Sequence, residues 1–424
     1  MQPRHGRSPR GPTPVTAAEE IRHRAAETAA SAETLEAIGV GAVAGAIARA
    51  AAALVDPESD IGSEARLLLV ESTGLSREMV GWGLTTTCGD ASADALEALA
   101  AAADLTGETS PSARSIPARA RLAAVVLSGN VFTAPFRAIA LPLLAGVPVI
   151  AKASSRDDIF PRVFRRALEA AAPDVAASYA VLTFEGGDTH LEDALFAQAD
   201  VVAAYGSDTT LGHIRGRLPA TTTFVPHGHG LGAIWIPDEA DDEVVARVAL
   251  DVAAYDQRGC LSPHSIWVGG DAGRGRGFAE RLAGALEAIR DSLPRGRLPL
   301  DRGAQQLQWR GVAAARGDLF EGDGYAVSFE GDGPLRLSPG YRNVSVLSCA
   351  SAEDLGRRLV PLGVHLKALG VAADTPARRA LAAALPAPLA PRVSEVGSMQ
   401  TPPLDSLADG HSPWLGLIRH TQID

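Results

Sequence analysis

Residues 256–264 read Asp-Gln-Arg-Gly-Cys-Leu-Ser-Pro-His, and the rest of the chain is organised around this stretch. The preceding residues, 241–255, predict a helix, because their valines and alanines recur on one apolar face. The following residues, 265–268, are apolar and β-prone and end at two glycines, so they predict a strand. Cys260 is therefore expected on a loop between two rigid elements, where proteins often display reactive side chains.

Cys260 is the candidate nucleophile of the chain. Gly259 lets the backbone approach a ligand closely, and the N–H of Cys260 can face an oxygen of an acyl group bound to its own sulfur. The alternative is a buried thiol that only packs. Cys88 lies in a polar run and Cys349 ends a strand-like run, and neither is framed by Gly and Pro, so both are interpreted as structural.

Length and composition place the chain among globular α/β proteins. Its 424 residues suffice for two domains, and 46% apolar but only 5% aromatic residues favour aliphatic helices packed on a parallel sheet. The formal net charge of −11 argues against nucleic acid as a partner, since phosphate binding needs a basic surface. Three cysteines fit a reducing cytoplasm better than a disulfide framework. No apolar run of about 18 residues is found, so no membrane span is expected.

From residue 121 onward, short apolar runs alternate with helical patterns. The runs that predict strands of a first unit are 122–127, 147–151, 180–184, 201–205 and 222–225. Such alternation is typical of a parallel, doubly wound Rossmann-type sheet, which binds a dinucleotide at the carboxyl ends of its strands. A second α/β unit follows the cysteine loop, with strands expected near 265–268, 327–329, 344–347 and 365–370.

These patterns divide the chain into five regions. Residues 1–16 are expected to form a disordered tail, because basic residues lie there among prolines and glycines. The remaining regions are an Ala-rich helical region, a cofactor domain, a catalytic cysteine domain and an irregular C-terminal segment, at 17–118, 119–238, 239–385 and 386–424.

Polar residues follow three of the strands predicted in the cofactor domain. Asn130 follows the first strand and could join the N–H of Cys260 in an oxyanion hole, although Gly-Asn after a strand is also ordinary turn chemistry. Lys152 follows the second strand and could reach a ribose or phosphate. Gly206 and Ser207 follow the fourth strand and open a helix, whose N-terminus could face a pyrophosphate.

Residues 227–232 read His-Gly-His-Gly-Leu-Gly and precede a predicted strand. Because no helix follows, the glycines are interpreted as allowing close approach of the backbone to a neighbour, and not as a dinucleotide fingerprint. His227 and His229 could bind a metal, but no third ligand lies at a suitable spacing, so no metal site is predicted.

The order of these residues resembles the aldehyde dehydrogenase superfamily, in which an Asn, a Lys, a Gly-Ser turn and a cysteine loop follow one another. Within it, the chain is most similar to the LuxC-type acyl-CoA reductases. The stretches that carry this resemblance are Thr-Gly-Leu-Ser at 73–76, the run 256–264, and Gly-Ser-Met-Gln-Thr-Pro-Pro-Leu at 397–404 with Asp409-Gly410 after it. The resemblance covers most of the chain beyond about residue 64 and implies an aldehyde dehydrogenase-like fold, a nicotinamide cofactor and a homo-oligomer.

Three departures from the superfamily pattern bear on the reaction. Hydrolytic relatives carry a Glu that activates water, but the corresponding region here, 227–230, reads His-Gly-His-Gly and has no carboxylate. A thioester is therefore expected to survive hydrolysis and to exchange with coenzyme A, although His229 remains an alternative base. Many NAD-using relatives place a Glu three residues beyond the Lys (Lys152 here), where this chain has Ser155. Ser155 or Arg156 could donate to a 2′-phosphate, so NADPH is predicted over NADH. The run 337–342 stands where the superfamily carries a Glu-x-Phe-Gly-Pro run, whose Glu holds the nicotinamide ribose, so this ribose contact is not carried over to the chain.

The resemblance therefore implies NADPH-dependent reduction of an acyl thioester to the aldehyde. Cys260 is expected to attack a fatty acyl group carried by coenzyme A or an acyl carrier protein, while Asn130 and the N–H of Cys260 hold the oxyanion. The nicotinamide then supplies hydride to the cysteinyl thioester. Three alternatives remain: a hydrolytic aldehyde dehydrogenase working with NAD(P)+, an acyl-phosphate reductase, and a non-catalytic subunit of the same fold.

Overall fold

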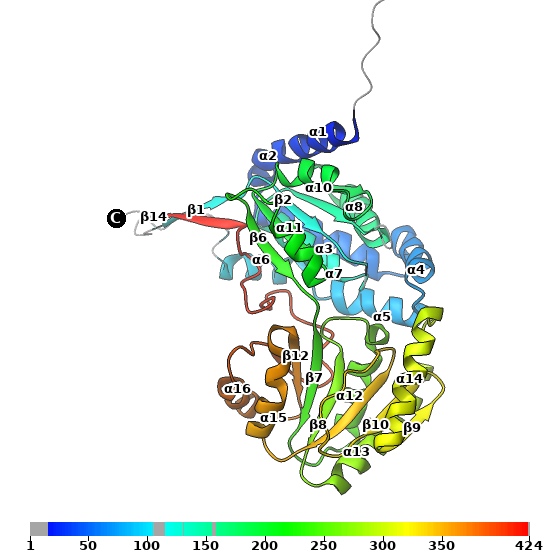
Figure 1. Cartoon of the computed structure of the whole chain (residues 1–424). Helices are drawn as coiled ribbons and strands as arrows, with labels where there is room; N and C mark the ends of the chain where they lie inside the picture. Colours follow the sequence, from blue (N-terminus) through cyan, green and yellow to red (C-terminus); the bar gives the residue numbers. More distant parts are fainter. Residues whose placement is uncertain (1–15, 104, 106–114, 130, 155–157, 423–424) are drawn as a thin grey trace, which may run out of the picture.

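The computed structural model describes residues 16–103, 105, 115–129, 131–154 and 158–422. The described chain forms two α/β lobes, and it passes from one to the other where β6 (Thr223–His227) leads into β7 (Leu231–Ile236) (Figure 1). The expected tail, residues 1–16, lies outside the described residues except for Thr16, whose side chain caps the first helix.

The first lobe is built on a parallel five-stranded sheet in the order β4-β3-β2-β5-β6. Its strands are β2 (Ala123–Val126), β3 (Val149–Ala153), β4 (Tyr179–Thr183), β5 (Val201–Tyr205) and β6. The chain runs outward from β2 to β4 and then returns to the other side of β2 to form β5 and β6. This is the predicted doubly wound topology, and its switch point lies between the carboxyl ends of β2 and β5.

Helices cover both faces of this sheet because successive residues of each strand point to opposite sides. Ala123 and Val125 pack with α3 (Val40–Val55), α7 (Ala134–Leu144) and α8 (Ile159–Ala171). Ala124 and Val126 pack with the opposite layer, formed by α1 (Ala17–Ala30), α10 (Thr189–Phe196) and α11 (Asp208–Arg215). The remaining helices of the lobe are α2 (Ala32–Ile38), α4 (Asp60–Thr73), α5 (Arg77–Cys88), α6 (Ala93–Ala102) and α9 (Pro173–Ala176).

The Thr-Gly-Leu-Ser run at 73–76 is a helix end followed by a helix start. Gly74 ends α4 in the left-handed conformation, with φ 66°, which glycine adopts without a steric penalty. Ser76 then caps α5 by accepting a hydrogen bond from the Met79 N–H at 3.1 Å. Local capping chemistry therefore explains this motif.

The second lobe is built on a seven-stranded sheet in the order β13-β12-β7-β8-β11-β10-β9. The β9–β10 pair is antiparallel and the other pairs are parallel. Its strands besides β7 are β8 (Pro263–Gly269), β9 (Asp318–Gly322), β10 (Tyr325–Phe329), β11 (Asn343–Cys349), β12 (Leu366–Val371) and β13 (Arg392–Glu395).

Helices also cover both faces of this second sheet. One face packs on α12 (Asp242–Ala253) and α13 (Ala272–Ala288), and the other on α15 (Ala352–Leu359) and α16 (Thr375–Ala384). The helix α14 (Leu300–Arg316) packs against β9 and β10 at the sheet edge. Three short 3₁₀ segments complete the lobe: η1 (Ala254–Gln257), η2 (Ile289–Asp291) and η3 (Val360–His365).

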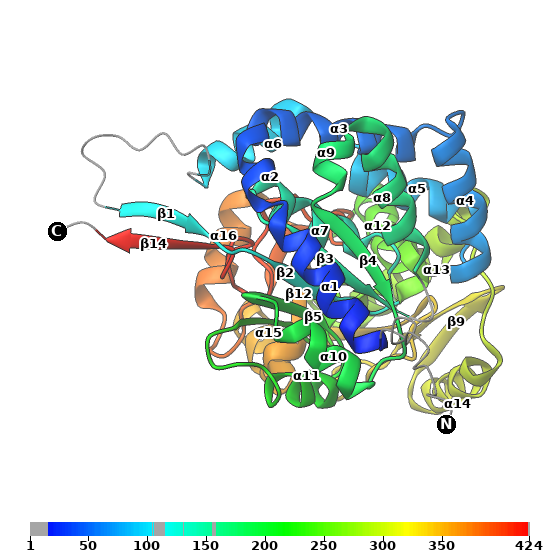
Figure 2. The ribbon, with the colours of Figure 1, turned by 90° about the horizontal axis from the view of Figure 1, so that it is seen from above.

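β6 is the last strand of the five-stranded sheet and β7 already belongs to the seven-stranded sheet. β7 nevertheless precedes residue 238, where the sequence predicts the boundary between the cofactor and cysteine domains. Residues 386–424 contain β13 and β14 (Ile418–Gln422), where the sequence predicts an irregular segment. β14 pairs antiparallel with β1 (Ser115–Arg119) in a ribbon that projects from the first lobe (Figures 1 and 2). The five regions as separate folding units stay a prediction.

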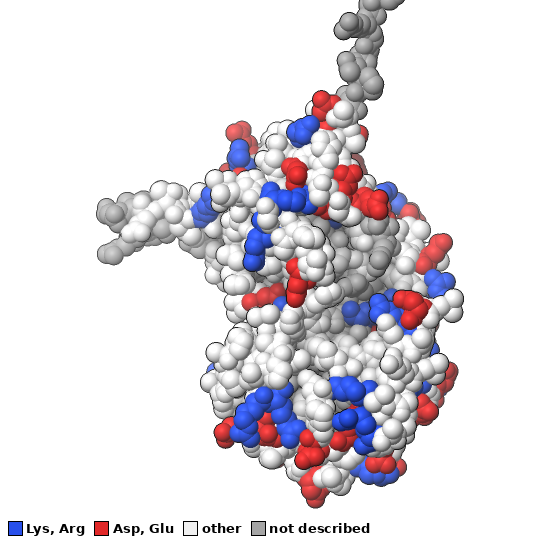
Figure 3. All heavy atoms as spheres, in the orientation of Figure 1, with Lys and Arg blue, Asp and Glu red and all other residues white. Residues whose placement is uncertain are grey.

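Acidic and basic side chains are interspersed on the face shown in Figure 3. Among the described residues, no single helix is long and apolar enough to cross a membrane. The helices spanning 17–38 and 40–55 meet the length and composition together, but only as a pair bent by 109°.

Candidate active site

Cys260 lies on the loop between α12 and β8, at the contact between the lobes. A Cβ atom added to Gly259 would lie 3.4 Å from Val131 in the first lobe and 3.4 Å from Gln400 in the C-terminal segment. The loop backbone therefore lies against both, and glycine is the residue type that this close packing accommodates.

The backbone before Cys260 has three consecutive left-handed residues. Tyr255, Asp256 and Gln257 have φ of 51°, 50° and 60°, a conformation that non-glycine residues rarely adopt. The Tyr255 hydroxyl is 2.9 Å from the Thr133 hydroxyl, and the Gln257 amide donates to the Pro263 carbonyl. Such strain persists only where surrounding contacts hold it, and it is typical of functional loops.

A buried ion pair fixes the same loop from the second lobe. Asp256 and Arg342 lie 2.9 Å apart, and each side chain is only 1% exposed. Asp256 also accepts a hydrogen bond from the Gly296 N–H at 2.9 Å. Arg258, next to the cysteine loop, pairs with Asp256 at 3.5 Å and donates to the Thr73 carbonyl at 2.7 Å. The Arg258 guanidinium is therefore engaged with an acid and a carbonyl instead of the thiol.

The Met-Gln-Thr-Pro-Pro-Leu run is fixed beside the cysteine loop by Asp251 of α12. The Asp251 carboxyl accepts hydrogen bonds from the N–H groups of Gly397 and Met399, while burial raises its pKa to about 7. Gln400 follows and packs against Gly259. This contact brings together two of the stretches that carry the family resemblance, although they lie about 140 residues apart in the sequence.

The glycines at 228–232 allow the close approach that the sequence predicts. The Gly232 N–H donates to the Ser262 carbonyl at 2.7 Å, and a Cβ on Gly232 would overlap the Leu261 carbonyl oxygen. A Cβ on Gly230 would overlap the side chain of Lys367. Glycine at these positions therefore permits both the cysteine loop and Lys367 to reach their observed places.

The Cys260 side chain is accessible to solvent, although protein surrounds it on most sides. This burial raises the pKa of the thiol, the negative Asp409 raises it further, and the positive Lys367 opposes both. The thiol is therefore expected to be largely protonated at neutral pH, so attack on an acyl group would require a proton acceptor.

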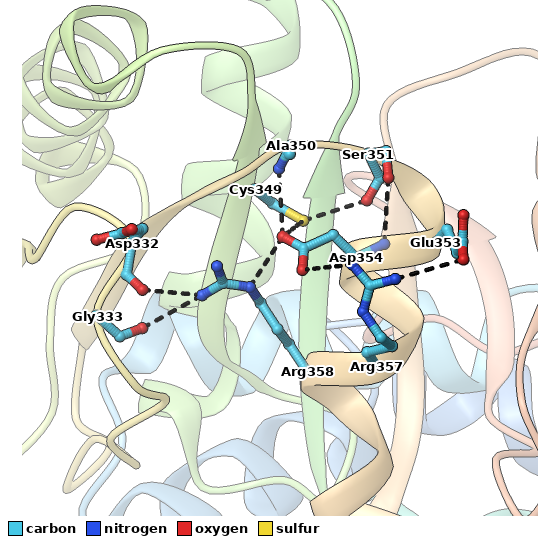
Figure 4. A network of polar contacts seen from close by, with 9 residues as sticks. All are labelled: Asp332, Gly333, Cys349, Ala350, Ser351, Glu353, Asp354, Arg357 and Arg358. Carbon is cyan, nitrogen blue, oxygen red and sulfur yellow. Dashed lines mark hydrogen bonds and ion pairs between the residues drawn. The ribbon is translucent and has the colours of Figure 1, made fainter.

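The other two cysteines are buried, as their interpretation as structural residues requires. Burial raises the pKa of Cys88 to about 12 and that of Cys349 to about 11. Figure 4 shows Cys349 in a polar network, where its sulfur lies 3.3 Å from the Ser351 carbonyl and 3.5 Å from Asp354. Neither thiol is placed to act as a nucleophile.

Lys152 lies near the end of β3, at the carboxyl edge of the five-stranded sheet, but its side chain turns toward the end of β4. Its ammonium lies 5.1 Å from the centre of the Phe184 ring, and the residue is only 4% exposed. Burial lowers the pKa of Lys152, and Glu192 opposes this. A largely buried cation at this edge suits an anionic ligand.

The turn at Gly206 and Ser207 leads from β5 into α11. The Ser207 hydroxyl caps this helix by accepting from the Thr210 N–H at 3.1 Å. This leaves the N–H groups of Asp208 and Thr209, among the described residues, for an anion at the helix N-terminus. A Cβ on Gly206 would lie 3.3 Å from Thr210, so the turn is tight.

Three predicted site residues, Asn130, Ser155 and Arg156, lie outside the described residues. Val131, the neighbour of Asn130, packs against Gly259. Within the described ranges, no group of three or more His, Cys, Asp or Glu side chains is arranged to hold a metal ion.

Sequence reasoning missed a polar cluster centred on Asp409 of the C-terminal segment. Asp409 lies 2.7 Å from the Lys367 ammonium and 3.6 Å from Nδ1 of His227. The His227 ring in turn stacks on Tyr205, with ring centres 4.3 Å apart. The Asp409-Gly410 pair that accompanies the family resemblance was the available signal, but nothing in the sequence connects it to Lys367.

A cavity of about 80 Å³, lined in part by His227, lies between the five-stranded sheet, α7 and residues 408–417. Its walls are mostly apolar, from the small residues of β2 and β5 and from Leu141, Leu415 and Leu417. Polar residues also line it, among them Tyr205, His227, Arg137 and His411.

Known proteins resemble this chain in sequence and in fold. The family model described as acyl-CoA reductase (LuxC) matches residues 38–418. A lactaldehyde dehydrogenase structure is 15% identical with a TM-score of 0.71, covering 97% of this chain and 92% of that one. Aldehyde dehydrogenase 21 from Physcomitrella patens is 14% identical with a TM-score of 0.75, covering 96% and 90%.

A third structure, an NAD-dependent benzaldehyde dehydrogenase from Corynebacterium glutamicum, is 15% identical with a TM-score of 0.71, covering 96% of this chain and 88% of that one. No curated protein matches the chain. Identities this low show the fold alone, whereas the family model spans nearly the whole sequence. The chain is therefore an enzyme of the acyl-CoA reductase (LuxC) family with an aldehyde dehydrogenase-like α/β fold.

Proposed function

We propose that this enzyme reduces an acyl thioester to the aldehyde through a covalent thioester on Cys260, with NADPH as the reductant. The observation that carries this proposal is the cysteine loop. Cys260 is the accessible cysteine of the three, its loop is held in a strained conformation, and it lies against Val131 of the cofactor lobe. A thiol held in this way is typical of an acyl-transferring nucleophile.

The residues at the carboxyl edge of the first sheet fit a nicotinamide dinucleotide. The N-terminus of α11 and the buried ammonium of Lys152 offer donors for its phosphates and riboses. When bound, the reduced cofactor supplies the hydride. The protein holds the acyl group on Cys260, with the N–H of Cys260 and Asn130 proposed to stabilise its oxyanion.

The carrier of the acyl group is proposed to be coenzyme A or an acyl carrier protein, and the acyl group itself to be apolar. The apolar walls of the cavity beside Tyr205 support this. The purified protein is to be incubated with NADPH and acyl-CoAs of graded chain length, while cofactor absorbance and aldehyde are followed together. Equal amounts of oxidised cofactor and aldehyde are expected; cofactor oxidation without aldehyde would reject the proposal.

The cofactor preference is proposed to depend on residues 155 and 156. Replacing Ser155 with Glu would place a carboxylate against the 2′-phosphate, so the KM for NADPH is expected to rise about tenfold or more while that for NADH changes little. The neutral Ser155→Gln variant, which has the same length, is the control. If Glu and Gln raise the KM for both cofactors equally, residue 155 does not face the 2′-phosphate.

One observation favours the hydrolytic alternative, because His227 with its Asp409 partner could also activate water. Hydrolysis would release a carboxylic acid from an aldehyde and NADP+ without coenzyme A. Incubation with an aldehyde and NADP+ in the absence of coenzyme A separates the two reactions, and little acid is expected from the proposed reductase.

A further inference from the structure

Tyr255 anchors the cysteine loop in the first lobe. It belongs to η1 of the second lobe and precedes Cys260 closely in the sequence, yet its ring packs among residues of the first lobe. The ring meets those of Trp82 and Phe132 edge-on, with centroids 5.3 and 5.9 Å away. Its backbone N–H donates to Sδ of Met79 at 3.1 Å, and the residue is only 3% exposed. The second lobe therefore inserts this side chain into the first.

The Tyr255 hydroxyl has two hydroxyl partners in the first lobe. It lies 2.9 Å from Oγ1 of Thr133 and 3.4 Å from Oγ1 of Thr87. Thr133 occupies the N-cap position of α7, where a threonine hydroxyl ordinarily accepts a hydrogen bond from the first turn of its own helix. Among the described residues, the Thr133 hydroxyl makes no such capping bond. Thr133 therefore uses its side chain to hold Tyr255 instead of capping α7.

Two further features show that the fold makes room for this contact. A Cβ atom on Gly83, inside α5, would lie 2.8 Å from the Phe132 ring and 3.0 Å from the Tyr255 ring, so a side chain there would displace both. Tyr255 itself has φ 51°, which an aromatic residue rarely adopts. A glycine inside a helix and a left-handed tyrosine both cost stability, and they persist here because the surrounding packing requires them.

The loop that follows Tyr255 is closed by its own hydrogen bonds. The Arg258 N–H donates to the Tyr255 carbonyl at 3.2 Å. In the turn that contains Cys260, the Ser262 N–H donates to the Gly259 carbonyl at 3.1 Å, and the Gly259 N–H donates to the Ser262 hydroxyl at 3.2 Å. A displacement of Tyr255 is therefore expected to move Cys260 with it.

Both ends of this loop meet the same short segment of the first lobe. Gly259 packs against Val131, and the Tyr255 hydroxyl bonds to Thr133. Asn130, the proposed oxyanion donor, immediately precedes Val131 in the sequence. An apolar contact such as that of Val131 leaves the loop free to slide, whereas a hydrogen bond between two buried hydroxyls fixes distance and direction.

We propose that Tyr255 is a positioning residue for acyl transfer, because its bond to Thr133 sets the place of Cys260 relative to the segment that follows β2. This inference rests on the proposed function. In that reaction the Cys260 sulfur bonds to the thioester carbon, the bond to the carrier sulfur breaks, and the thiol proton leaves with the carrier thiol. The carbonyl oxygen carries negative charge in between, and an error of about 1 Å in such a geometry can cost about 100-fold in rate.

Three substitutions isolate the bond between the two hydroxyls. Tyr255→Phe removes only the phenolic oxygen, Thr133→Val replaces the hydroxyl by a methyl group, and Thr133→Ser keeps the hydroxyl. Each variant is acylated at Cys260 by an acyl-CoA and by p-nitrophenyl butyrate, an ester that needs no carrier recognition. Each is also alkylated at Cys260 by iodoacetamide, a reaction of the same sulfur that creates no oxyanion. Peptide mass analysis locates and times both modifications.

Tyr255→Phe and Thr133→Val should each slow acylation by more than about fivefold while changing alkylation by less than about twofold, since only acylation needs the oxyanion donor in place. The double variant should acylate at about the rate of the slower single variant, because both changes remove the same bond. Thr133→Ser should retain the wild-type rate. A general loosening of the fold would instead alter the two reactions together.

Tyr179→Phe is the matched control. Tyr179 is 1% exposed, and its hydroxyl donates to the Pro161 carbonyl at 3.0 Å. It begins the edge strand β4, at the opposite end from the carboxyl edge of the five-stranded sheet. Its loss should lower the midpoint of denaturant unfolding much as Tyr255→Phe does, yet leave acylation unchanged.

A smaller slowing of acylation in Tyr255→Phe, or an equal slowing of alkylation, would overturn the role of Tyr255 and leave the proposed function standing. Wild-type protein that neither donor acylates at Cys260 would reject the proposed function, and this inference with it. Wild-type protein that accepts only the ester would reject the proposed carrier, while the ester rates would still decide the role of Tyr255.

Discussion

Replacing Cys260 with Ala is expected to abolish both covalent acyl capture and aldehyde formation. The sulfur is the proposed attachment point of the acyl group, and removal of a nucleophile costs about four orders of magnitude or more in rate. Cofactor binding should persist, because Lys152 and the N-terminus of α11 lie on the other lobe from the cysteine. Intact-protein mass after incubation with acyl-CoA and cofactor binding by fluorescence provide the two readouts.

Cys349→Ala is the control for this variant, because Cys349 is a buried thiol in the same lobe whose pKa is raised to about 11. It should acylate and turn over at close to the wild-type rate. Acyl transfer that persists in Cys260→Ala, or disappears in Cys349→Ala, would contradict the assignment of the nucleophile.

Replacing Asp256 with Ala is expected to lower the free energy of unfolding by about 3–5 kcal/mol, the usual cost of leaving one partner of a buried ion pair alone. Arg342 is 1% exposed and would keep its charge without the 2.9 Å contact. The Gly296 N–H would also lose its acceptor. Because Asp256 belongs to the strained run before Cys260, acylation should slow as well. Denaturant unfolding and the acylation assay measure the two effects.

An exposed ion pair provides the comparison for Asp256. Glu353 and Arg357 lie 3.3 Å apart, with side chains 86% and 65% exposed. Glu353→Ala should change stability by less than about 1 kcal/mol, as is usual for solvated pairs. If Asp256→Ala destabilises no more than Glu353→Ala, the buried pair does not hold the cysteine loop.

The sequence alone predicts those parts of the fold and of the candidate site that depend on a local pattern of residues. The alternation after residue 121 predicted the parallel sheets, since each strand is a short apolar run between turn residues. The loop at 256–264 was found because glycine and proline frame Cys260. The Ser76 cap and the glycines at 230 and 232 likewise follow from local chemistry.

The sequence alone does not predict contacts between strands or side chains that lie far apart along the chain. β1 and β14 pair across about 300 residues, and neither segment has an apolar pattern that indicates its partner. Lys367 and Asp409 lie on segments without a common motif, so their 2.7 Å contact appears only when β12 and the C-terminal segment are folded together. For the same reason, the sequence does not show that Arg258, although it precedes Cys260 closely, is engaged by Asp256 and by the Thr73 carbonyl.

The most direct test follows the acyl group on the protein itself. Wild-type enzyme incubated with an acyl-CoA in the absence of reductant should gain the mass of one acyl group, on the peptide that contains Cys260. Addition of NADPH should then remove that mass and release an equal amount of aldehyde. Aldehyde produced without any acyl group appearing on Cys260, or an acyl-enzyme that releases only carboxylic acid when NADPH is added, would contradict the account.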